Sequence, residues 1–238
     1  YANNGGAVYV KNAAFNMSGD AAIIGNSAGN VGGVNVSNNG TFTMSGSAKI
    51  VNNAAISSQN YASGGVSVGN DSKFYVSGNV QITGNTKGSK VSVKNNVYLD
   101  GNYQGMSTII IDEGGLNDSA QIGVTTNDKP EGETEVQIAT GATSDPDYTK
   151  IITSDDDTYE VAHDSTDATK LVLKVAPEKP HTHFLCTTGN TCTKVGGHDC
   201  GSNKTTFATK LWYDKDQQKL MMGKDEWTTT ETIVGSNP

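Results

Sequence analysis

The sequence predicts an all-β fold: a right-handed parallel β-helix, which is a solenoid, with a small β module at the C-terminus. Three observations lead to this prediction. A pattern recurs over residues 5–100, apolar and polar residues alternate inside each copy, and Gly, Asn and Ser separate the alternating segments. Alternation with a period of two indicates strands with one buried face, and a recurring unit of this kind is typical of stacked coils.

The copies are aligned on their glycine pairs, and Gly also suits the corners of each coil because it accepts positive φ. "GGAVYV" begins at Gly5, "GGVNV" at Gly32 and "GGVSV" at Gly64. "SKVSV" at Ser89 is interpreted as a degenerate fourth copy. Each copy then supplies three short strands, which would lie about 4.8 Å from those of the next copy. The aligned apolar lines are Val8, Val34, Val66 and Val91; Phe15, Phe42, Phe74 and Val97; Met17, Met44, Val76 and Leu99; and Ile23, Ile50 and Ile82.

An asparagine follows the isoleucine line at the same place in each copy, as Asn26, Asn53 and Asn85. Stacked asparagines can form a ladder of hydrogen bonds, and Asn also suits a turn that makes no ladder. Both interpretations stay open at the level of the sequence.

The second copy contains an insertion. Its Val-to-Val spacing is 32 residues, against 26 in the first copy, and the excess lies in "AAISSQNYAS", residues 54–63. Insertions in repeats become loops, loops carry recognition, and Tyr offers a large contact area at low entropic cost. The candidate ligand-binding residues are therefore Ser58, Gln59, Asn60 and Tyr61; the alternative is an ordinary loop.

The chain is expected to divide into three parts. Residues 1–125 form the parallel β-helix rungs, and residues 126–176 form an acidic β capping region that hides the edge of the last coil. The linker signal "PEKP" opens residues 177–238, a small Cys/His-containing β module. In this module "KLWY" and "KLMM" flank the charged turn "DKDQQ", which indicates a hairpin.

The pattern "GGxVxV…FxMSG…Ix(G/N)N" resembles the β-helix repeats of very large, adhesin-like surface proteins of gut Firmicutes. "NNVYLDG…STIIIDEGGLNDSAQIGVTT" is similar to the terminal rung of that family, and "HTHFLC" resembles its junction between modules. The resemblance covers residues 5–200. It implies an extracellular location at the bacterial cell surface or cell wall, with attachment through parts outside this fragment. Some proteins of similar build bind host immunoglobulin.

The segment "HTHFLCTTGNTCTKVGGHDCGS" gathers all the cysteines of the chain. Tetrahedral zinc takes four Cys or His ligands, and the candidate structural zinc site is His183, Cys186, His198 and Cys200. The alternative is a disulfide among Cys186, Cys192 and Cys200, which is the usual outcome in a secreted protein. Relatives carry Cys-x-Cys after the histidines, whereas this chain reads Cys-Thr-Thr-Gly, which leaves both alternatives open.

Charge is distributed unevenly. Residues 1–100 hold six Lys and three Asp, whereas residues 101–180 hold five Lys and sixteen acidic residues. Arg, the residue best suited to grip phosphate, is absent, so nucleic acid is not expected as a partner. No run of about 18 apolar residues occurs, so membrane insertion of this fragment is not expected. The acidic stretch 144–160 offers oxygen ligands for Ca²⁺ or is a solvated face.

Catalysis is not expected either. A glycan-degrading β-helix needs two carboxylates that face one groove. Residues 1–100 offer only Asp20, Asp71 and Asp100, which the alignment does not bring together as a pair. The motifs of serine hydrolases, phosphate-binding loops and zinc proteases are missing from the sequence.

The sequence therefore favours a monomeric, non-catalytic binding module at a bacterial surface. The expected partner is a host macromolecule: immunoglobulin, mucin or another glycoprotein, or a mucosal glycan. The alternative is a structural stalk or spacer in a giant surface protein, and a glycan-degrading enzyme is the least favoured. The insertion at residues 54–63 and the change of charge along the chain favour binding, because a spacer needs neither.

Overall fold

The computed structural model describes residues 6–102, 105–177, 183–185, 210–214 and 219–223. The chain separates into two compact units, Tyr1–Ala176 and Pro177–Pro238, and each is described by itself. The described residues form strands and turns without any helix, which confirms the all-β class. In particular, no helix long and apolar enough to cross a lipid bilayer occurs in the described part of the chain.

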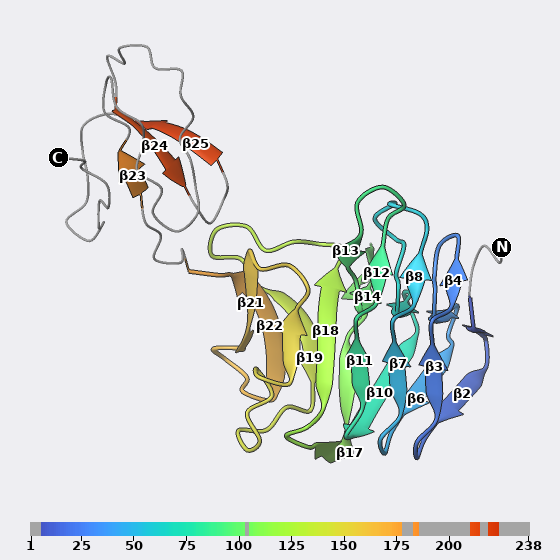
Figure 1. The fold of residues 1–238 in the computed structure, drawn as a ribbon. Helices are drawn as coiled ribbons and strands as arrows, with labels where there is room; N and C mark the ends of the chain where they lie inside the picture. Colours follow the sequence, from blue (N-terminus) through green and yellow to red (C-terminus); the bar gives the residue numbers. More distant parts are fainter. Residues whose placement is uncertain (1–5, 103–104, 178–182, 186–209, 215–218, 224–238) are drawn as a thin grey trace. The chain divides into compact units, whose positions relative to one another are not determined.

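The first unit is a stack of coils in which strands of successive coils lie side by side (Figure 1). Coil 1 contains β1 (Val8–Lys11), β2 (Ala14–Met17), β3 (Ala22–Ile24) and β4 (Ser27–Ala28). Coil 2 contains β5 (Val34–Ser37), β6 (Thr41–Met44), β7 (Lys49–Val51) and β8 (Ala54–Ala55). Coil 3 contains β9 (Val66–Val68), β10 (Lys73–Gly78), β11 (Gln81–Thr83) and β12 (Thr86–Lys87). Coil 4 contains β14 (Val97–Leu99), β17 (Ile109–Leu116) and β18 (Gln121–Thr126).

The predicted apolar lines are in register through the first three coils. Equivalent strands pair in parallel, so that like residues lie directly above one another and face the interior of the coil. The stacked sets are Val8–Val34–Val66, Phe15–Phe42–Phe74, Met17–Met44–Val76 and Ile23–Ile50–Ile82. The first unit is therefore a parallel β-helix, as expected from the sequence.

These lines form the hydrophobic core of the first unit. The rings of Phe15 and Phe42 stack with centroids 5.4 Å apart, and those of Phe42 and Phe74 with centroids 5.0 Å apart. Stacked aromatic pairs contribute stability beyond the apolar area that they bury. Phe42 and Phe74 are fully buried, whereas Phe15, in the first described coil, is half-buried.

The fourth copy begins at Val97 and not, as expected, at Val91. Val91 is 74 % exposed and lies in the connection between β12 and β13 (Val93–Lys94), which pair antiparallel as a hairpin. "SKVSV" repeats the local alternation of a coil strand, and alternation alone does not tell an insertion from a coil. In coil 4, Val97 takes the place expected for Val91, Ile109 the place expected for Val97, and Ile111 the place expected for Leu99. Ile122 adds a fourth member to the isoleucine line.

The glycine pairs allow close contact between coils rather than a left-handed backbone. A Cβ added to Gly33 would lie 2.4 Å from the carbonyl oxygen of Gly65, and one added to Gly65 would lie 2.2 Å from that of Asn96. Positive φ occurs instead at the Ser-Gly turns, for example 61° at Gly19 and 68° at Gly46. Positive φ at the corner glycines is therefore confirmed, whereas the glycine pairs require Gly because the backbone of the next coil lies so close.

A ladder of amide side chains runs along one corner of the stack. The backbone N and Nδ2 of Asn26 both donate to Oδ1 of Asn53, at 2.9 and 3.0 Å. Asn53 donates to Asn85 in the same way, and Asn85 to Asn96. The carboxylate of Asp155 accepts the last two hydrogen bonds, from N and Nδ2 of Asn96. The ladder interpretation is confirmed, and an ionised carboxylate suits its end because it only accepts.

Residues 126–176 first continue the stack and then cover it. β19 (Val136–Thr140) pairs in parallel with β17, and β20 (Ile152–Ser154) pairs in parallel with β18. β22 (Lys170–Val175) and β21 (Tyr159–His163) then add antiparallel strands beyond β19. β18 pairs with both β11 and β14, so it joins two sides of the coil in one sheet. A short hairpin of β15 (Gly101–Asn102) and β16 (Gly105–Met106) interrupts coil 4.

The second unit is described through three antiparallel strands, β23 (His183–Leu185), β24 (Lys210–Asp214) and β25 (Lys219–Gly223). The hairpin expected between "KLWY" and "KLMM" is confirmed, because β24 pairs with β25. The candidate zinc and disulfide residues Cys186, Cys192, His198 and Cys200 lie outside the described residues, and His183 is described only as the first residue of β23.

Candidate binding surfaces

The insertion expected in the second copy leaves the coil between β8 and β9. Ten residues, 56–65, connect these strands, whereas five, 29–33, connect β4 and β5 in coil 1. The backbone N of Ile56 donates to coil 1 at 2.9 Å and that of Ser57 at 2.8 Å, which fixes one side of the loop. We name residues 56–62 the insertion loop.

The tip of the insertion loop brings the predicted residues together at the surface. Ser58, Gln59 and Asn60 are exposed, and Tyr61 is 54 % exposed. The backbone N of Ala62 donates to the carbonyl of Gln59 at 3.0 Å, and Ala62 itself is fully buried, which returns the chain to the coil. The loop therefore presents four polar or aromatic side chains from a base that is anchored on both sides.

Lys87 holds the loop tip from the next coil. Its Nζ donates to the carbonyl oxygens of Gln59 and Asn60, at 3.4 and 3.2 Å. The same ammonium lies over the ring of Tyr98, 6.0 Å from the centroid. Burial and the charge of Lys129 both lower the pKa of Lys87. Sequence reasoning missed this residue, although it continues the line of Ala28 and Ala55 once β8 and β12 are stacked.

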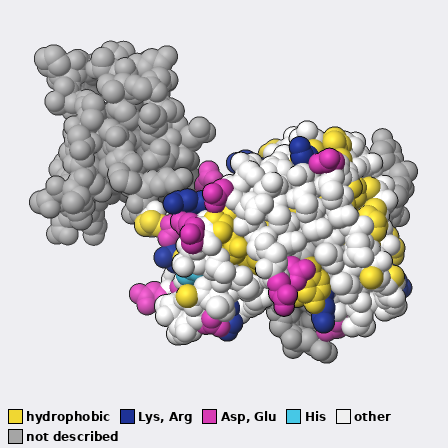
Figure 2. Space-filling view, turned by 90° about the horizontal axis from the view of Figure 1, so that it is seen from below, with side chains coloured by type: hydrophobic (Ala, Val, Ile, Leu, Met, Phe, Trp, Pro, Cys, Tyr) yellow, Lys and Arg dark blue, Asp and Glu magenta, His cyan; other side chains and the backbone are white. Residues whose placement is uncertain are grey.

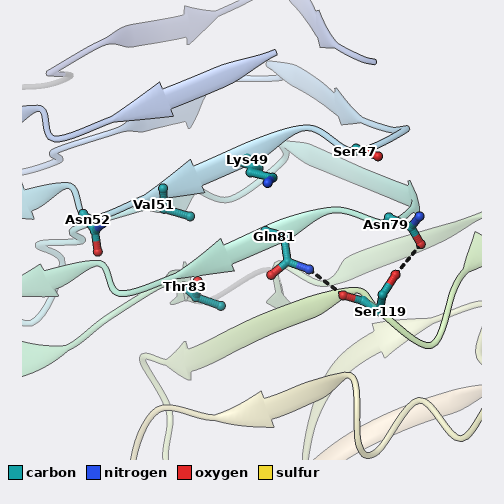
Figure 3. Close-up of a pocket in the computed structure, with 8 residues that line it drawn as sticks. All are labelled: Ser47, Lys49, Val51, Asn52, Asn79, Gln81, Thr83 and Ser119. Carbon is teal, nitrogen blue, oxygen red and sulfur yellow. Dashed lines mark hydrogen bonds between the residues drawn. The ribbon is translucent and has the colours of Figure 1, made fainter. Parts of the chain in front are cut away.

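A shallow groove of about 540 Å³ runs along the outward face of β7 and β11 (Figure 3). Lys49 and Gln81 lie in register there, and their side chains point away from the core. At one end, Gln81 Nε2 donates to the carbonyl of Ser119, whose hydroxyl donates to Asn79 Oδ1 at 2.8 Å. The sequence did not predict this groove. The one feature of the sequence that corresponds to it is the outward-facing residue next to each buried Ile of β7 and β11.

The surface of the coils carries few charges. On the face shown in Figure 2, most described atoms belong to uncharged polar side chains or backbone, and the acidic and basic side chains lie next to one another in a few small groups. Asp20 lies in the turn after β2, Asp71 in the turn before β10, and Asp100 directly after β14. Two of these carboxylates therefore belong to different turns, and the third lies between β14 and β15.

A turn motif repeats through the acidic stretch 144–160 and the residues just after it. In this motif an Asp Oδ1 accepts hydrogen bonds from the backbone N and the hydroxyl of the Thr two residues on. The Thr hydroxyl is the main reason why the pKa values of Asp147, Asp164 and Asp167 are lowered. Among the described residues, no group of three or more His, Cys, Asp or Glu is arranged to hold a metal ion. The motif occurs at Asp147–Thr149, Asp156–Thr158, Asp164–Thr166 and Asp167–Thr169.

The fold and these surfaces define a β-solenoid with an exposed insertion loop on one coil and additional strands over its C-terminal end. Comparison with protein-family models, with curated proteins and with solved structures found no match to this chain.

Proposed function

We propose that this chain is a non-catalytic, adhesin-like binding module of a bacterial cell surface, and that it recognises a host macromolecule through the insertion loop. The partner is a mucosal protein such as immunoglobulin or a glycoprotein such as mucin. One observation carries the proposal. An insertion that interrupts the regular coil is fixed at its base and its tip, yet it exposes Ile56 and Tyr61, which are 39 % and 54 % exposed.

A fixed loop favours binding because the entropy of ordering it is already lost before the partner arrives. Tyr is also enriched among the residues that contribute most to protein interfaces, since its ring is large, rigid and amphipathic. The extracellular location at the cell surface or cell wall rests on the resemblance of the repeats to surface proteins of gut Firmicutes.

A structural stalk is the second candidate. The Asn ladder and the stacked Phe rings run without interruption through coils 1–3, and such continuity suits a stiff spacer. A spacer, however, gains nothing from a loop that one coil projects and the next coil holds through Lys87.

The binding proposal is tested by biolayer interferometry with the full 238-residue chain. Mammalian immunoglobulins G and A and purified mucin are the immobilised probes. The matched control lacks residues 57–61, which leaves five residues between β8 and β9, as between β4 and β5 in coil 1. We expect saturable binding to at least one probe and a loss of about tenfold or more in affinity for the control.

Two outcomes would contradict the proposal. Full binding by the shortened chain would move the site away from the insertion loop. Absence of binding to every probe, by a chain that melts cooperatively, would favour the stalk.

A further inference from the structure

A second cavity lies beside the insertion loop and is lined by residues of β12 and β13 and of the segments that follow β18 and β20. Its volume is about 450 Å³, within the range of roughly 300–1,000 Å³ that is typical of small-molecule sites. Its walls hold several charged groups, one amide, one hydroxyl and one apolar side chain. The lining residues are Lys87, Val93, Lys94, Asn95, Thr125, Lys129 and Asp155, Asp156 and Asp157.

Three lysines line this cavity, Lys87 and Lys94 on one side and Lys129 from the segment after β18. After burial, the charge of Lys129 is the second cause of the lowered pKa of Lys87, so the two ammonium groups repel each other. Nζ of Lys129 lies 5.5 Å from the ring centroid of Tyr159. Within the described residues, neither Lys87 nor Lys129 is joined to a carboxylate in a salt bridge, although burial lowers the pKa of Lys129 against the opposing charges of Asp156 and Asp155. An anion placed between the two ammonium groups relieves their mutual repulsion.

The cavity wall also contains an unsatisfied buried amide. Asn95 is fully buried, and in the described structure neither its Nδ2 nor its Oδ1 has a hydrogen-bond partner. Buried polar groups without partners are rare because each one costs free energy. Both atoms are closed to solvent, so a ligand hydroxyl, which donates and accepts, can satisfy them only if the side chain turns into the cavity.

The carboxylates of the cavity restrict the kind of anion that fits. Asp155 already accepts hydrogen bonds from Asn96 and Thr125, and Asp156 accepts them from Thr158. Their remaining lone pairs, and those of Asp157, repel a bare inorganic anion but accept hydrogen bonds from hydroxyl groups. The matching ligand therefore has one anionic group and several hydroxyls. The 47 % exposed side chain of Val93 adds an apolar contact for ring carbons.

From this combination we infer that the cavity binds an acidic sugar unit of a glycan. The carboxylate or sulfate of the sugar lies between the ammonium groups of Lys87 and Lys129, and its hydroxyls face Asn95 and Asp157. Lys87 contributes its third donor, because two others are engaged by the insertion loop. The inference goes beyond the proposed function: it concerns a different surface and stands whether or not the loop binds a host protein.

The test is isothermal titration calorimetry of the full chain. The probes are N-acetylneuraminic acid and glucuronic acid for a carboxylate, and galactose 6-sulfate for a sulfate. Galactose and N-acetylglucosamine are the neutral controls, and free glutamate presents a carboxylate without a sugar. We expect binding of at least one acidic sugar and none of the controls. Lys129→Met should weaken that binding by about tenfold or more, since a charge-assisted hydrogen bond is lost.

The matched control is Lys73→Met, which removes an exposed lysine from β10, outside the cavity, and should bind as the unchanged chain does. Equal binding of neutral and acidic sugars, or unchanged affinity in Lys129→Met, would overturn the inference. If Lys129→Met proves unstable, the salt dependence of the unchanged chain decides. Affinity that falls as salt rises supports a charged site, and affinity independent of salt contradicts it.

Discussion

At the scale of single residues, the Asn ladder shows why one side-chain type recurs at one corner. Asn53 Oδ1 accepts two hydrogen bonds from Asn26, while its Nδ2 donates to Asn85 Oδ1 and to the carbonyls of Ile23 and Val51. Because the short Asn side chain carries both an acceptor and a donor, almost all of its hydrogen-bonding capacity is used. Neither Ser nor Asp offers both an accepting oxygen and an NH₂ group in the same place.

The ladder is tested by Asn85→Ala. The substitution leaves the backbone N of Asn53 without its acceptor in a buried corner and removes one of the three acceptors of Asn53 Nδ2. We expect a loss of about 2–4 kcal/mol in the free energy of unfolding, measured by urea denaturation. Asn16→Ala, on the exposed face of β2, is the control and should stay within about 0.5 kcal/mol of the unchanged chain. Equal effects of the two substitutions would show that the ladder contributes no stability.

Asp155, at the end of the ladder, gives a pH prediction. Burial raises its pKa above 3.8, although hydrogen bonds from Asn96 and Thr125 favour the ionised form. The folded state therefore binds the proton more tightly than the unfolded chain. Its contribution to stability is present below the unfolded pKa and is lost as pH rises through the raised, folded pKa.

Asp155→Asn removes this titration. The free energy of unfolding of the variant, relative to the unchanged chain, should therefore increase between about pH 3 and about pH 7. Chemical denaturation at both pH values measures it. A difference between the two proteins that does not change with pH would contradict the raised pKa.

At the scale of elements, the stacked Phe rings predict a graded response. Phe42 is packed between two rings and fully buried, so Phe42→Ala should cost about 3–5 kcal/mol. Phe15→Ala should cost less, because Phe15 is half-buried and contacts one ring in the described stack. Thermal and urea unfolding of both variants would check the order, and equal losses would contradict it.

The strands of coils 1–3 were predictable from the sequence because the same pattern of apolar residues repeats in each copy and sets the register between copies. Val, Phe, Met and Ile each recur at fixed places, and only one pairing buries all four lines together. Coil 4 was not predictable in the same way. The hairpin of β12 and β13 mimics a coil strand, and Asn95 and Asn96 replace the glycine pair that marked the earlier copies.

The candidate sites were predictable only in part. The sequence locates the insertion loop, because an excess of residues between two aligned strands has to leave the coil. Lys87, Lys129 and Asn95 were not found, because their meeting depends on contacts between distant segments. Lys129, for example, follows β18, a strand that joins two sides of the stack and that no repeat predicts.

At the scale of the whole molecule, stability and recognition are carried by different residues. The core lines and the ladder hold the coils together, whereas the insertion loop contributes few buried side chains. Deleting residues 57–61 should therefore change the melting temperature by no more than about 4 °C, roughly 1 kcal/mol for a chain of this size. Differential scanning calorimetry measures this change. A much larger drop would mean that the loop is part of the structural framework.

The central claim is that Tyr61, on the insertion loop, anchors a host macromolecule. The most direct measurement compares Tyr61→Ala with Tyr9→Ala in binding to immobilised immunoglobulin or mucin. The two tyrosines are similarly exposed, at 54 % and 48 %, but Tyr9 lies on β1 of coil 1. We predict that Tyr61→Ala weakens binding by about tenfold or more while Tyr9→Ala leaves it unchanged. Binding by Tyr61→Ala at the strength of the unchanged chain would contradict the claim.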